Sequence, residues 1–532
     1  MWMGGKRSVM KVINQLKPLA EARCYILGMV SESDFSVQDL SDQESVRLNK
    51  LDELRKCGIN PYPPEAFEVT CKTVDIINDF DHYHNTHVKI AGRLMNKRVM
   101  GGASFGEIKD FHGKIQIYIQ RDSICCDNDK TLYNVIFKKL IDLGDIVGVQ
   151  GYVFKTKTGE ISIHVEEFIL LSKSLKPLPV VKDDGNTIYD SFNDKEQCYR
   201  QRYLDLIVNK KSLGVFKQRT RIVQEMRNFM NSFEYQEVET PILQPIYGGA
   251  AARPFKTHHN TLDRELYMRI SNELYLKRLI IGGYEGVYEF SKDFRNEGMD
   301  RYHNPEFTQV ELYVAYKDYK WMMHFVEEMM LHVINELLSK HEVMVGDTVV
   351  NFSSPWECYT MFEVIEKFTG VDVRGKNESD LKHIANDLGV IIDDTFGYGK
   401  IVDEIFSKKC EQHLIQPTFI IDYPIEMSPL AKQKADDPGL VERFELFING
   451  KECANAFSEL NDPIEQRKRF EAELQLARRG DPEAMVMDND FINAMSYGMP
   501  PTAGVGIGID RLTMILTDSR SIQDVIFFPQ MR

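Results

Sequence analysis

Residues 287–314 constrain the fold most, because two runs of alternating side chains flank a short polar loop. In the first run aromatic and polar residues alternate, as in Tyr288, Glu289, Phe290 and Ser291. In the second run the apolar positions are Val310, Leu312 and Val314, and the alternate positions are Phe307, Gln309, Glu311 and Tyr313. Side chains at i and i+2 of a strand share a face. We therefore predict two adjacent antiparallel strands, with the apolar positions against helices and Glu311 and Tyr313 on the other face.

The loop between these runs concentrates charge, with Arg295, Glu297, Arg301 and His303 close together in the chain. An ordinary polar hairpin would also carry charged residues. The combination of Arg, Glu and His with an aromatic residue in so short a stretch favours a functional site over a solvated turn.

Composition excludes several classes of protein. The chain has 532 residues, 43% of them hydrophobic and 27% charged, which is ordinary for a globular protein of roughly two to four domains. The formal charge of −15 provides no global basic field, so any nucleic-acid contact requires a local patch. The nine cysteines are odd in number and no two are spaced as C-x-x-C. We therefore expect no zinc cage or disulfide framework, which suits a reducing compartment such as the cytoplasm.

The segment 65–175 has the pattern of a small β-barrel. Short apolar runs separated by glycine-containing turns lie at residues 87–94, 104–109, 115–120, 146–154 and 161–171. This pattern predicts an OB-type Greek-key barrel. Lys and Arg outnumber Asp and Glu over residues 87–122, and Phe105, Gln116 and Tyr118 lie among them. Basic charge for phosphates and flat rings for bases suit a single-stranded nucleic acid, although this region alone fits a solvated barrel face equally well.

The rest of the chain divides by composition. We expect an N-terminal extension at 1–40 that need not be ordered, a helix within 41–64 and a linker at 176–198. The mixed α and β region at 199–532 is long for one domain, and helical periodicity places an insertion near 359–414. The basic N-terminus leaves open a transit peptide or a dispensable extension before Met29. No apolar run reaches about 18 residues, so no membrane span is expected.

A second pair of acidic residues flanks Asn449-Gly450, which is a strong signal for a two-residue hairpin turn. Such a turn pairs Ile448 with Lys451 and Phe447 with Glu452. Glu445 and Glu452 then become diagonal neighbours, roughly 7–8 Å apart. Two carboxylates at this separation can share divalent ions that bridge triphosphate oxygens, although two solvated glutamates are the default.

Ordered motifs connect these features to a known family. The string FRNEG…HNPEF resembles motif 2 of class II aminoacyl-tRNA synthetases, GVGIGIDR at 504–511 resembles motif 3, and 233–241 resembles motif 1. Four further segments resemble the lysyl-tRNA synthetases within that class: GGAAARPFKTHHN (248–260), ELYLKR (273–278), RFELF (443–447) and FSELNDP (457–463). The resemblance runs from about residue 40 to the end. It implies an α+β fold, with an OB-type anticodon-binding barrel before an antiparallel-sheet catalytic domain.

The resemblance also implies an activity and an ATP site. Members of the family activate lysine with ATP, release pyrophosphate and transfer lysine to tRNA, with magnesium as cofactor. Such chemistry requires charge neutralisation and positioning, for which the catalytic candidates are Arg295 and Arg511. The implied ATP-binding set is Arg295, Glu297, His303, Asn304, Phe307, Glu445, Glu452 and Arg511, in which Glu445 and Glu452 are the magnesium ligands.

A lysine site can be argued from charge. The substrate ammonium requires buried negative charge, for which Glu311 and Glu459 are candidates, while Tyr313 can add a hydroxyl. The resemblance adds Gly249 and Glu273 at the α-amino group, and Asn455 and Phe457 around the substrate backbone. Strict alternation places Asn455, Phe457 and Glu459 opposite Glu452, so we predict a β-bulge near Cys453-Ala454. Two departures from the family pattern, Ser271-Asn272 and residues 453–456, affect no charged catalytic position.

Partners follow from the same reading. In the barrel, Phe105, Gln116 and Glu160 match anticodon-reading positions of the family, which implies tRNA as a partner beside L-lysine and ATP. A homodimer is expected through the helix around 221–233, whose apolar stripe comprises Ile222, Val223, Met226, Phe229 and Met230. Two alternatives remain open at this point: an aspartate or asparagine ligase on the same scaffold, and a non-catalytic tRNA-binding paralogue.

Overall fold

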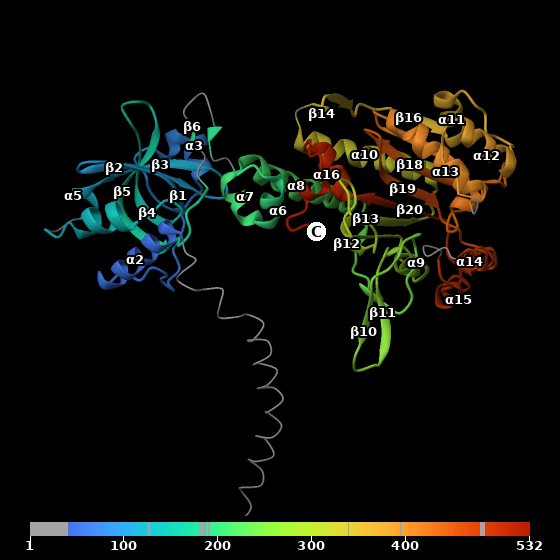
Figure 1. Cartoon of the computed structure of the whole chain (residues 1–532), viewed down its shortest axis with the longest axis horizontal. Helices are drawn as coiled ribbons and strands as arrows, with labels where there is room; N and C mark the ends of the chain where they lie inside the picture. The colour runs from blue at the N-terminus through green and yellow to red at the C-terminus, as the bar shows by residue number, and fades with distance from the viewer. Residues whose placement is uncertain are drawn as a thin grey trace, which may run out of the picture. The chain divides into compact units, whose positions relative to one another are not determined.

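The computed structural model describes residues 41–125, 128–179, 182–183, 188–189, 192–338, 340–393, 396–478 and 485–532. The predicted N-terminal extension and the question of its start lie outside these residues. The chain forms two compact units, Met1–Ser191 and Phe192–Arg532. Figure 1 labels their helices and strands.

The first unit contains a closed five-stranded barrel with the order β1-β2-β3-β5-β4, which confirms the predicted OB-type barrel. Its strands are β1 (His87–Met100), β2 (Ala103–Lys109), β3 (Lys114–Gln120), β4 (Ile146–Lys155) and β5 (Ile161–Ser172). All pairs are antiparallel except β3 with β5. The barrel closes on a core of isoleucine and valine, with Ile117, Val149 and Ile163 fully buried.

Short helical segments surround the barrel strands in the chain. They are α2 (Asp42–Lys56), α3 (Thr73–Asn78), α4 (Phe80–Tyr83), α5 (Arg121–Ile124) and the π-helical η3 (Leu132–Leu140), followed by two short strands, β6 (Lys182–Asp183) and β7 (Ile188–Tyr189). Ser41 and Glu44 form a reciprocal capping box at the start of α2. The helix ends before Gly58, whose φ of 76° favours glycine.

The second unit is built on an eight-stranded sheet with the order β16-β17-β18-β19-β20-β13-β12-β8. The strands are β8 (Gln236–Glu237), β12 (Gly286–Phe294), β13 (Glu306–Ala315), β16 (Glu357–Thr360), β17 (Thr418–Pro424), β18 (Leu440–Ile448), β19 (Lys451–Ser458) and β20 (Thr502–Gly508). Only the outermost pairs, β16 with β17 and β12 with β8, are parallel. The predicted antiparallel sheet, with β12 and β13 as neighbours, is therefore confirmed.

One face of this sheet packs against helices α8 (Lys210–Ser232), α10 (Tyr319–Leu337) and α16 (Ile509–Leu516) (Figure 1). Val310, Leu312 and Val314 lie in this core, as their alternation predicted. The apolar stripe of α8 lies there as well, with Ile222, Met226 and Met230 buried and Val223 and Phe229 packed against them. The stripe is therefore part of the chain's own core and is no free dimer surface.

Between β16 and β17 the chain forms three helices with a separate core: α11 (Met361–Thr369), α12 (Glu378–Asp387) and α13 (Tyr398–Lys409). The remaining elements are α6 (Lys195–Arg200), α7 (Arg202–Val208), β9 (Leu243–Gln244), β10 (Lys256–His259), β11 (Arg264–Met268), α9 (Glu273–Ile281), β14 (Glu342–Val345), β15 (Thr348–Asn351), η4 (Glu411–His413), η5 (Ile425–Met427), α14 (Pro463–Arg478), α15 (Asn489–Met495) and α17 (Ile522–Val525). Among the described residues, no helix combines the length and the apolar content needed to cross a bilayer.

Candidate active site

A floor of glycine lies on the sheet face opposite to α8, α10 and α16. Val505 and Ile507 of β20 point into the core, so Gly504, Gly506 and Gly508 lie on the opposite face. In register with this floor, Gly506 pairs with Glu311 on β13 and with Asn455 on β19. Gly504 likewise pairs with Tyr313 and with Phe457. The predicted lysine-site residues therefore line two sides of a strip without side chains.

Gly504 is required by this packing. A Cβ at this position would collide with Oε1 of Glu459 and with the Tyr313 ring. Gly249 also belongs to the cluster, because a Cβ there would come within 2.9 Å of the Ser271 hydroxyl and 3.1 Å of Cβ of Glu273. Its φ of 88° lies in the region that favours glycine. Both glycines thus bring the backbone close to buried carboxylates.

Glu311 lies at the centre of a polar cluster and is only 5% exposed. It accepts hydrogen bonds from the Ser271 hydroxyl at 2.9 Å, the Gln309 amide at 2.6 Å and the Tyr313 hydroxyl at 2.9 Å. Burial, reinforced by the carboxylates of Asp293 and Glu273, raises the pKa of Glu311 to about 8. The three donors orient the carboxylate, and none of them supplies a positive charge.

Glu289, which lies opposite Glu311 on the neighbouring strand, differs from it in having a cationic partner. Glu289 on β12 pairs in register with Glu311, but its carboxylate accepts from Arg269 at 2.6 Å. Arg269 also contacts Asp293 at 3.2 Å. Among the described residues, no Lys or Arg forms an ion pair with Glu311. This carboxylate therefore has the open charge requirement that a cationic ligand would meet.

Glu459 and Glu273 share one buried cation. The Nζ atom of Lys277 lies 2.5 Å from Oε1 of Glu273 and forms an ion pair with Oε2 of Glu459. The Lys277 side chain has 0% exposure, and its Nζ lies 5.3 Å from the centre of the Phe457 ring. Oε1 of Glu459 is buried without a hydrogen-bond partner. Lys277 thus links Glu273, Glu459 and Phe457, and the Ser271 hydroxyl links Glu273 to Glu311 by accepting from the Glu273 N–H at 3.1 Å and donating to Glu311.

Arg295 has a buried hydrogen-bond donor that no protein group satisfies in the described residues. Its guanidinium lies 5.0 Å from the centre of the Phe307 ring, and its Nε is buried with no hydrogen-bond partner. Its backbone N–H donates to the Pro305 carbonyl at 2.8 Å, which fixes the end of the loop. An arginine fork with an unsatisfied donor suits a phosphate or a carboxylate.

The second predicted catalytic arginine joins the hairpin to the loop. Arg511, in the first turn of α16, donates to the backbone carbonyl of Glu452 at 2.8 Å and contacts its carboxylate at 3.2 Å. Its other amino group lies 3.3 Å from Nε2 of His303, whose Nδ1 lies 2.9 Å from Asp300. Two further predicted residues occupy the same loop: Asn304 is buried and donates to the Glu306 carbonyl, whereas Glu297 is exposed.

The predicted hairpin and bulge are both confirmed. Asn449 and Gly450 form the turn with φ values of 52° and 68°, and Ile448 pairs with Lys451 and Phe447 with Glu452. The next pair is Leu446 with Ala454, so Cys453 is the extra residue on β19. The bulge allows Glu452 and Asn455 to face the same side, and Glu445 pairs directly with Asn455.

The hairpin carboxylates can be tested for a divalent ion. Glu445 is held by Arg443 at 2.5 Å and by the Tyr423 hydroxyl at 2.9 Å. Burial raises the pKa of Glu445 to about 7, with Glu452 adding to the rise, so the two carboxylates repel each other. No group of three or more His, Cys, Asp or Glu in the described residues could hold a metal alone. Two carboxylates fit an ion that takes its remaining oxygens from a phosphate ligand and water.

In the barrel unit, the three predicted anticodon residues lie on the outer surface. Phe105 pairs in register with Tyr118, and their ring centres are 5.1 Å apart. Gln116 accepts from the Ser162 hydroxyl at 2.8 Å, and Ser162 also lies 3.4 Å from the Glu160 carbonyl. Gln116 and Glu160 are therefore joined through one serine, and Glu160 itself is exposed.

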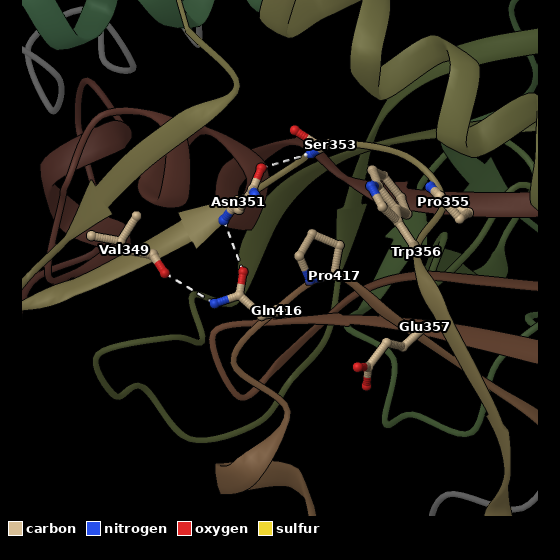
Figure 2. Close-up of a pocket in the computed structure, with 8 residues that line it drawn as sticks. All are labelled: Val349, Asn351, Ser353, Pro355, Trp356, Glu357, Gln416 and Pro417. Carbon is tan, nitrogen blue, oxygen red and sulfur yellow. Dashed lines mark hydrogen bonds between the residues drawn. The ribbon is translucent and has the colours of Figure 1, made fainter.

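Figure 2 shows a pocket of about 370 Å³ elsewhere in the second unit. It is lined by Val349, Asn351, Ser353, Pro355, Trp356, Glu357, Gln416 and Pro417. The Gln416 side chain donates to the Val349 carbonyl at 3.0 Å and accepts from the Asn351 N–H at 2.8 Å. None of the predicted site residues borders this pocket. The Gln416 amide is satisfied by these two hydrogen bonds, and we assign the pocket no ligand.

Comparisons with known proteins agree with this geometry. Residues 194–532 match the family model of class II tRNA synthetases (D, K and N). The chain belongs to this family. Residues 88–171 match the OB-fold nucleic acid binding domain. The class II match spans the sheet with its glycine floor, and the OB-fold match spans the barrel.

Curated relatives of this synthetase chain include proteins named lysine–tRNA ligase. The protein from Porphyromonas gingivalis is 55% identical over 500 residues, which cover 93% of this chain and 86% of the relative. That from Christiangramia forsetii is 56% identical over 498 residues, covering 93% and 87%. That from Azobacteroides pseudotrichonymphae is 55% identical over 494 residues, covering 93% and 99%.

Sequence reasoning missed several residues that contact the predicted site residues. The sequence motifs give Lys277 no role beyond its place in ELYLKR, although its i,i+4 spacing from Glu273 on a helix indicates an ion pair. Ser271 was noted only as a departure from the family pattern, and its hydroxyl contacts Glu311. Arg269 could not be found by spacing, because its partners Glu289 and Asp293 are distant in the chain.

Proposed function

We propose that this chain is a lysine–tRNA ligase, which activates L-lysine with ATP and transfers it to the 3′ end of its tRNA. The observation that carries the proposal is the cluster of three buried carboxylates, Glu273, Glu311 and Glu459, beside the glycine floor. Lysine offers two ammonium groups, and a buried cation requires a paired anion. Glu311 and Glu459 suit the side-chain ammonium, with Tyr313 beside them, and Glu273 and Gly249 suit the α-ammonium.

This cluster argues against the first alternative function, and Arg295 argues against the second. An aspartate carboxylate would be repelled by Glu311 and Glu459, and asparagine would leave Glu311 without a counter-ion. A non-catalytic paralogue has no need to keep Arg295 with a buried, unsatisfied Nε. The neutral parts of the substrate would lie against Phe457 and Asn455.

The residues support an in-line adenylation. The substrate carboxylate attacks the α-phosphorus of ATP, the bond to the bridging oxygen breaks, and pyrophosphate leaves. Arg295 suits the α-phosphate and the carboxylate, because its fork can bind both anions and neutralise the charge that develops between them. In the second step a ribose hydroxyl of the tRNA attacks the lysyl carbonyl and AMP leaves.

The remaining residues of the predicted ATP set serve to position the nucleotide. Phe307 offers a flat ring under the adenine, and Glu297 an acceptor for its amino group. Arg511 would cover the other face of the base, and His303 and Asn304 complete the phosphate and base pocket. In the free protein Arg511 contacts Glu452 and His303, so binding of ATP would exchange these contacts for contacts to the nucleotide.

We propose magnesium as the cofactor, held by Glu445 and Glu452. When bound, the ion would neutralise charge on the triphosphate. The protein's own part is to place two carboxylates on one face, through the Asn449-Gly450 turn and the bulge at Cys453. Arg443 and Tyr423 orient the Glu445 carboxylate for that role.

Anticodon reading, a homodimer and a cytoplasmic location complete the proposal. In the barrel, Phe105 would stack on an unpaired base of the anticodon, and Gln116 and Glu160 would bind base edges. For the dimer, support now comes from the segment after α8, where Phe233, Ile242, Leu243 and Ile246 are 42%, 44%, 50% and 37% exposed. Sedimentation at about micromolar concentration tests the dimer, and a monomer there would contradict it.

Amino-acid-dependent pyrophosphate exchange tests the activity. The purified chain is incubated with ATP, labelled pyrophosphate and each amino acid in turn, without tRNA. We expect exchange with L-lysine above all others. Exchange with aspartate or asparagine would favour the first alternative, and no exchange with any amino acid would favour the second.

A further inference from the structure

Lys277 is the residue that the described mechanism leaves without a role. It lies in the second turn of α9 and is fully buried. Its Nζ bridges the carboxylates of Glu273 and Glu459, which come from different elements: Glu273 begins α9 and Glu459 follows β19. Its third neighbour is the Phe457 ring, at 5.3 Å.

All three neighbours are residues to which the proposed function gives a substrate contact. Glu273 is proposed for the α-ammonium, Glu459 for the side-chain ammonium, and Phe457 for the substrate backbone. The bridge therefore joins the two ends of the proposed lysine site. A carboxylate that is bound on one oxygen by a fixed cation presents its other oxygen in a defined direction. Oε1 of Glu459, which lacks a hydrogen-bond partner, lies beside Gly504 and Tyr313.

The charges of the pocket give Lys277 a second effect. Glu273, Glu311 and Glu459 are all buried, and together with Lys277 they leave an excess of two negative charges when every group is ionised. Lysine supplies two ammonium groups, while its carboxylate faces Arg295. Without Lys277 the pocket would hold one uncompensated buried carboxylate even with substrate bound, which is strongly unfavourable.

We infer that Lys277 is a resident counter-ion that positions Glu273 and Glu459 and adjusts the charge of the pocket to a substrate with two ammonium groups. The inference rests on the proposed function and deepens it, because it names a specificity-determining residue that touches no substrate. Lys277 acts through the two glutamates, so it is a positioning residue and not a catalytic one.

The test compares two buried lysines of the same chain. Lys173 in the barrel unit is also 0% exposed and also bridges two carboxylates, Asp142 at 2.7 Å and Asp145 at 2.9 Å. Lys277→Met and Lys173→Met each remove a buried ammonium and keep similar volume. The readouts are the KM values for lysine and for ATP in pyrophosphate exchange without tRNA, and the melting temperature.

We expect both variants to melt at a lower temperature, because each leaves buried carboxylates unpaired. Only Lys277→Met should raise the KM for lysine, by roughly tenfold or more, with the KM for ATP changed by less than about twofold. Lys173→Met should leave both constants as in the wild type. A lysine KM within about twofold of the wild type in folded Lys277→Met would overturn the inference.

A second variant covers a failure to fold. Lys277→Arg keeps the positive charge but moves it, so it should raise the lysine KM by about threefold or more while the KM for ATP stays constant. An unchanged lysine KM in Lys277→Arg would overturn the positioning role of Lys277. Failure of the proposed function gives a different result, since the wild type itself would then show no lysine-dependent exchange.

Discussion

The two units present their candidate sites in opposite ways. On the sheet of the second unit, Glu311 and Glu459 are 5% and 1% exposed and are oriented by buried partners. On the barrel, Phe105 and Gln116 are half-buried and Glu160 is exposed, with neighbours that are mostly aromatic rings and one serine. A small charged substrate is recognised by desolvated, pre-oriented charge, whereas unpaired bases are recognised by rings and hydrogen bonds at a surface.

The comparison implies different energies at the two sites. Removing one buried charge leaves its partner charge buried and unpaired, which is strongly unfavourable. Removing one stacking ring loses only a single contact. It also implies that the two sites can be disabled separately, because they lie in different compact units. The variants below test both statements, beginning with the largest expected effect.

Glu311→Gln should have the largest effect. The substitution keeps the shape and most hydrogen bonds but removes a buried carboxylate that forms no ion pair with a Lys or Arg of the described residues. Breaking a buried pair costs roughly 3–5 kcal/mol, so lysine-dependent pyrophosphate exchange should fall by orders of magnitude. The KM for ATP should change little. Glu237→Gln on the exposed edge strand β8 serves as a control. If Glu311→Gln lowers only the melting temperature and keeps normal lysine affinity, Glu311 does not belong to the site.

Arg295→Ala should come next. Its guanidinium is proposed to neutralise the developing charge at the α-phosphate, and losing one such donor costs about 2.7–4 kcal/mol in kcat. Pyrophosphate exchange at saturating lysine and ATP measures the effect. Arg374→Ala provides a control, since Arg374 forms ion pairs with Glu366 and Asp372 in the insertion and lies half exposed. A loss confined to KM would show that Arg295 binds the ground state and not the transition state.

Phe105→Ala tests the barrel. Loss of one base-stacking platform should weaken tRNA binding by about 1–3 kcal/mol and leave lysine-dependent exchange without tRNA almost unchanged. Phe154→Ala is a matched control on β4, because its ring also neighbours Tyr118, at 6.0 Å. Binding is measured by filter retention or anisotropy with the unmodified tRNA. An equal loss in both assays would contradict the separation of the two units.

The fold could be predicted from the sequence because local patterns determined it. Alternation placed Val310, Leu312 and Val314 in the core, and the Asn449-Gly450 signal set the register of β18 and β19. The bulge at Cys453 followed from requiring Glu452 and Asn455 on one face. These are short-range constraints, in which each residue's position follows from its neighbours in the chain.

Long-range pairing could not be predicted in the same way. The stripe of Ile222, Met226 and Met230 was assigned to a dimer contact, because a periodic pattern does not reveal what covers it. In the structure α10 covers it within the chain. The Lys277–Glu459 pair joins residues far apart in the chain, which meet because α9 packs against the sheet. The placement of candidate residues was accessible from motifs, whereas the charge balance among them required coordinates.

The smallest expected effect concerns protons at Glu311. Burial raises the pKa of Glu311 to about 8, so most of this carboxyl is protonated at pH 7 in the free protein. A lysine ammonium pairs only with the ionised form, so binding should release a proton below pH 8. Between pH 7 and pH 8 the KM for lysine should then fall about fivefold, which is about 1 kcal/mol.

The stability of the folded protein should fall as the pH rises, whereas its affinity for lysine should rise. The pKa of Glu311 is higher in the folded protein than its ordinary value of 4.5, so the folded state binds more protons between these values. The contribution of Glu311 to stability is therefore complete below about pH 4.5 and is lost as the pH rises through 8. Calorimetry of lysine binding in buffers of different ionisation enthalpy measures the released proton. Glu311→Gln cannot ionise, so it should abolish both the proton release and this part of the pH dependence of melting. If the proton release persists in that variant, the titrating group is another residue of the cluster, such as Asp293, whose pKa burial raises to about 6.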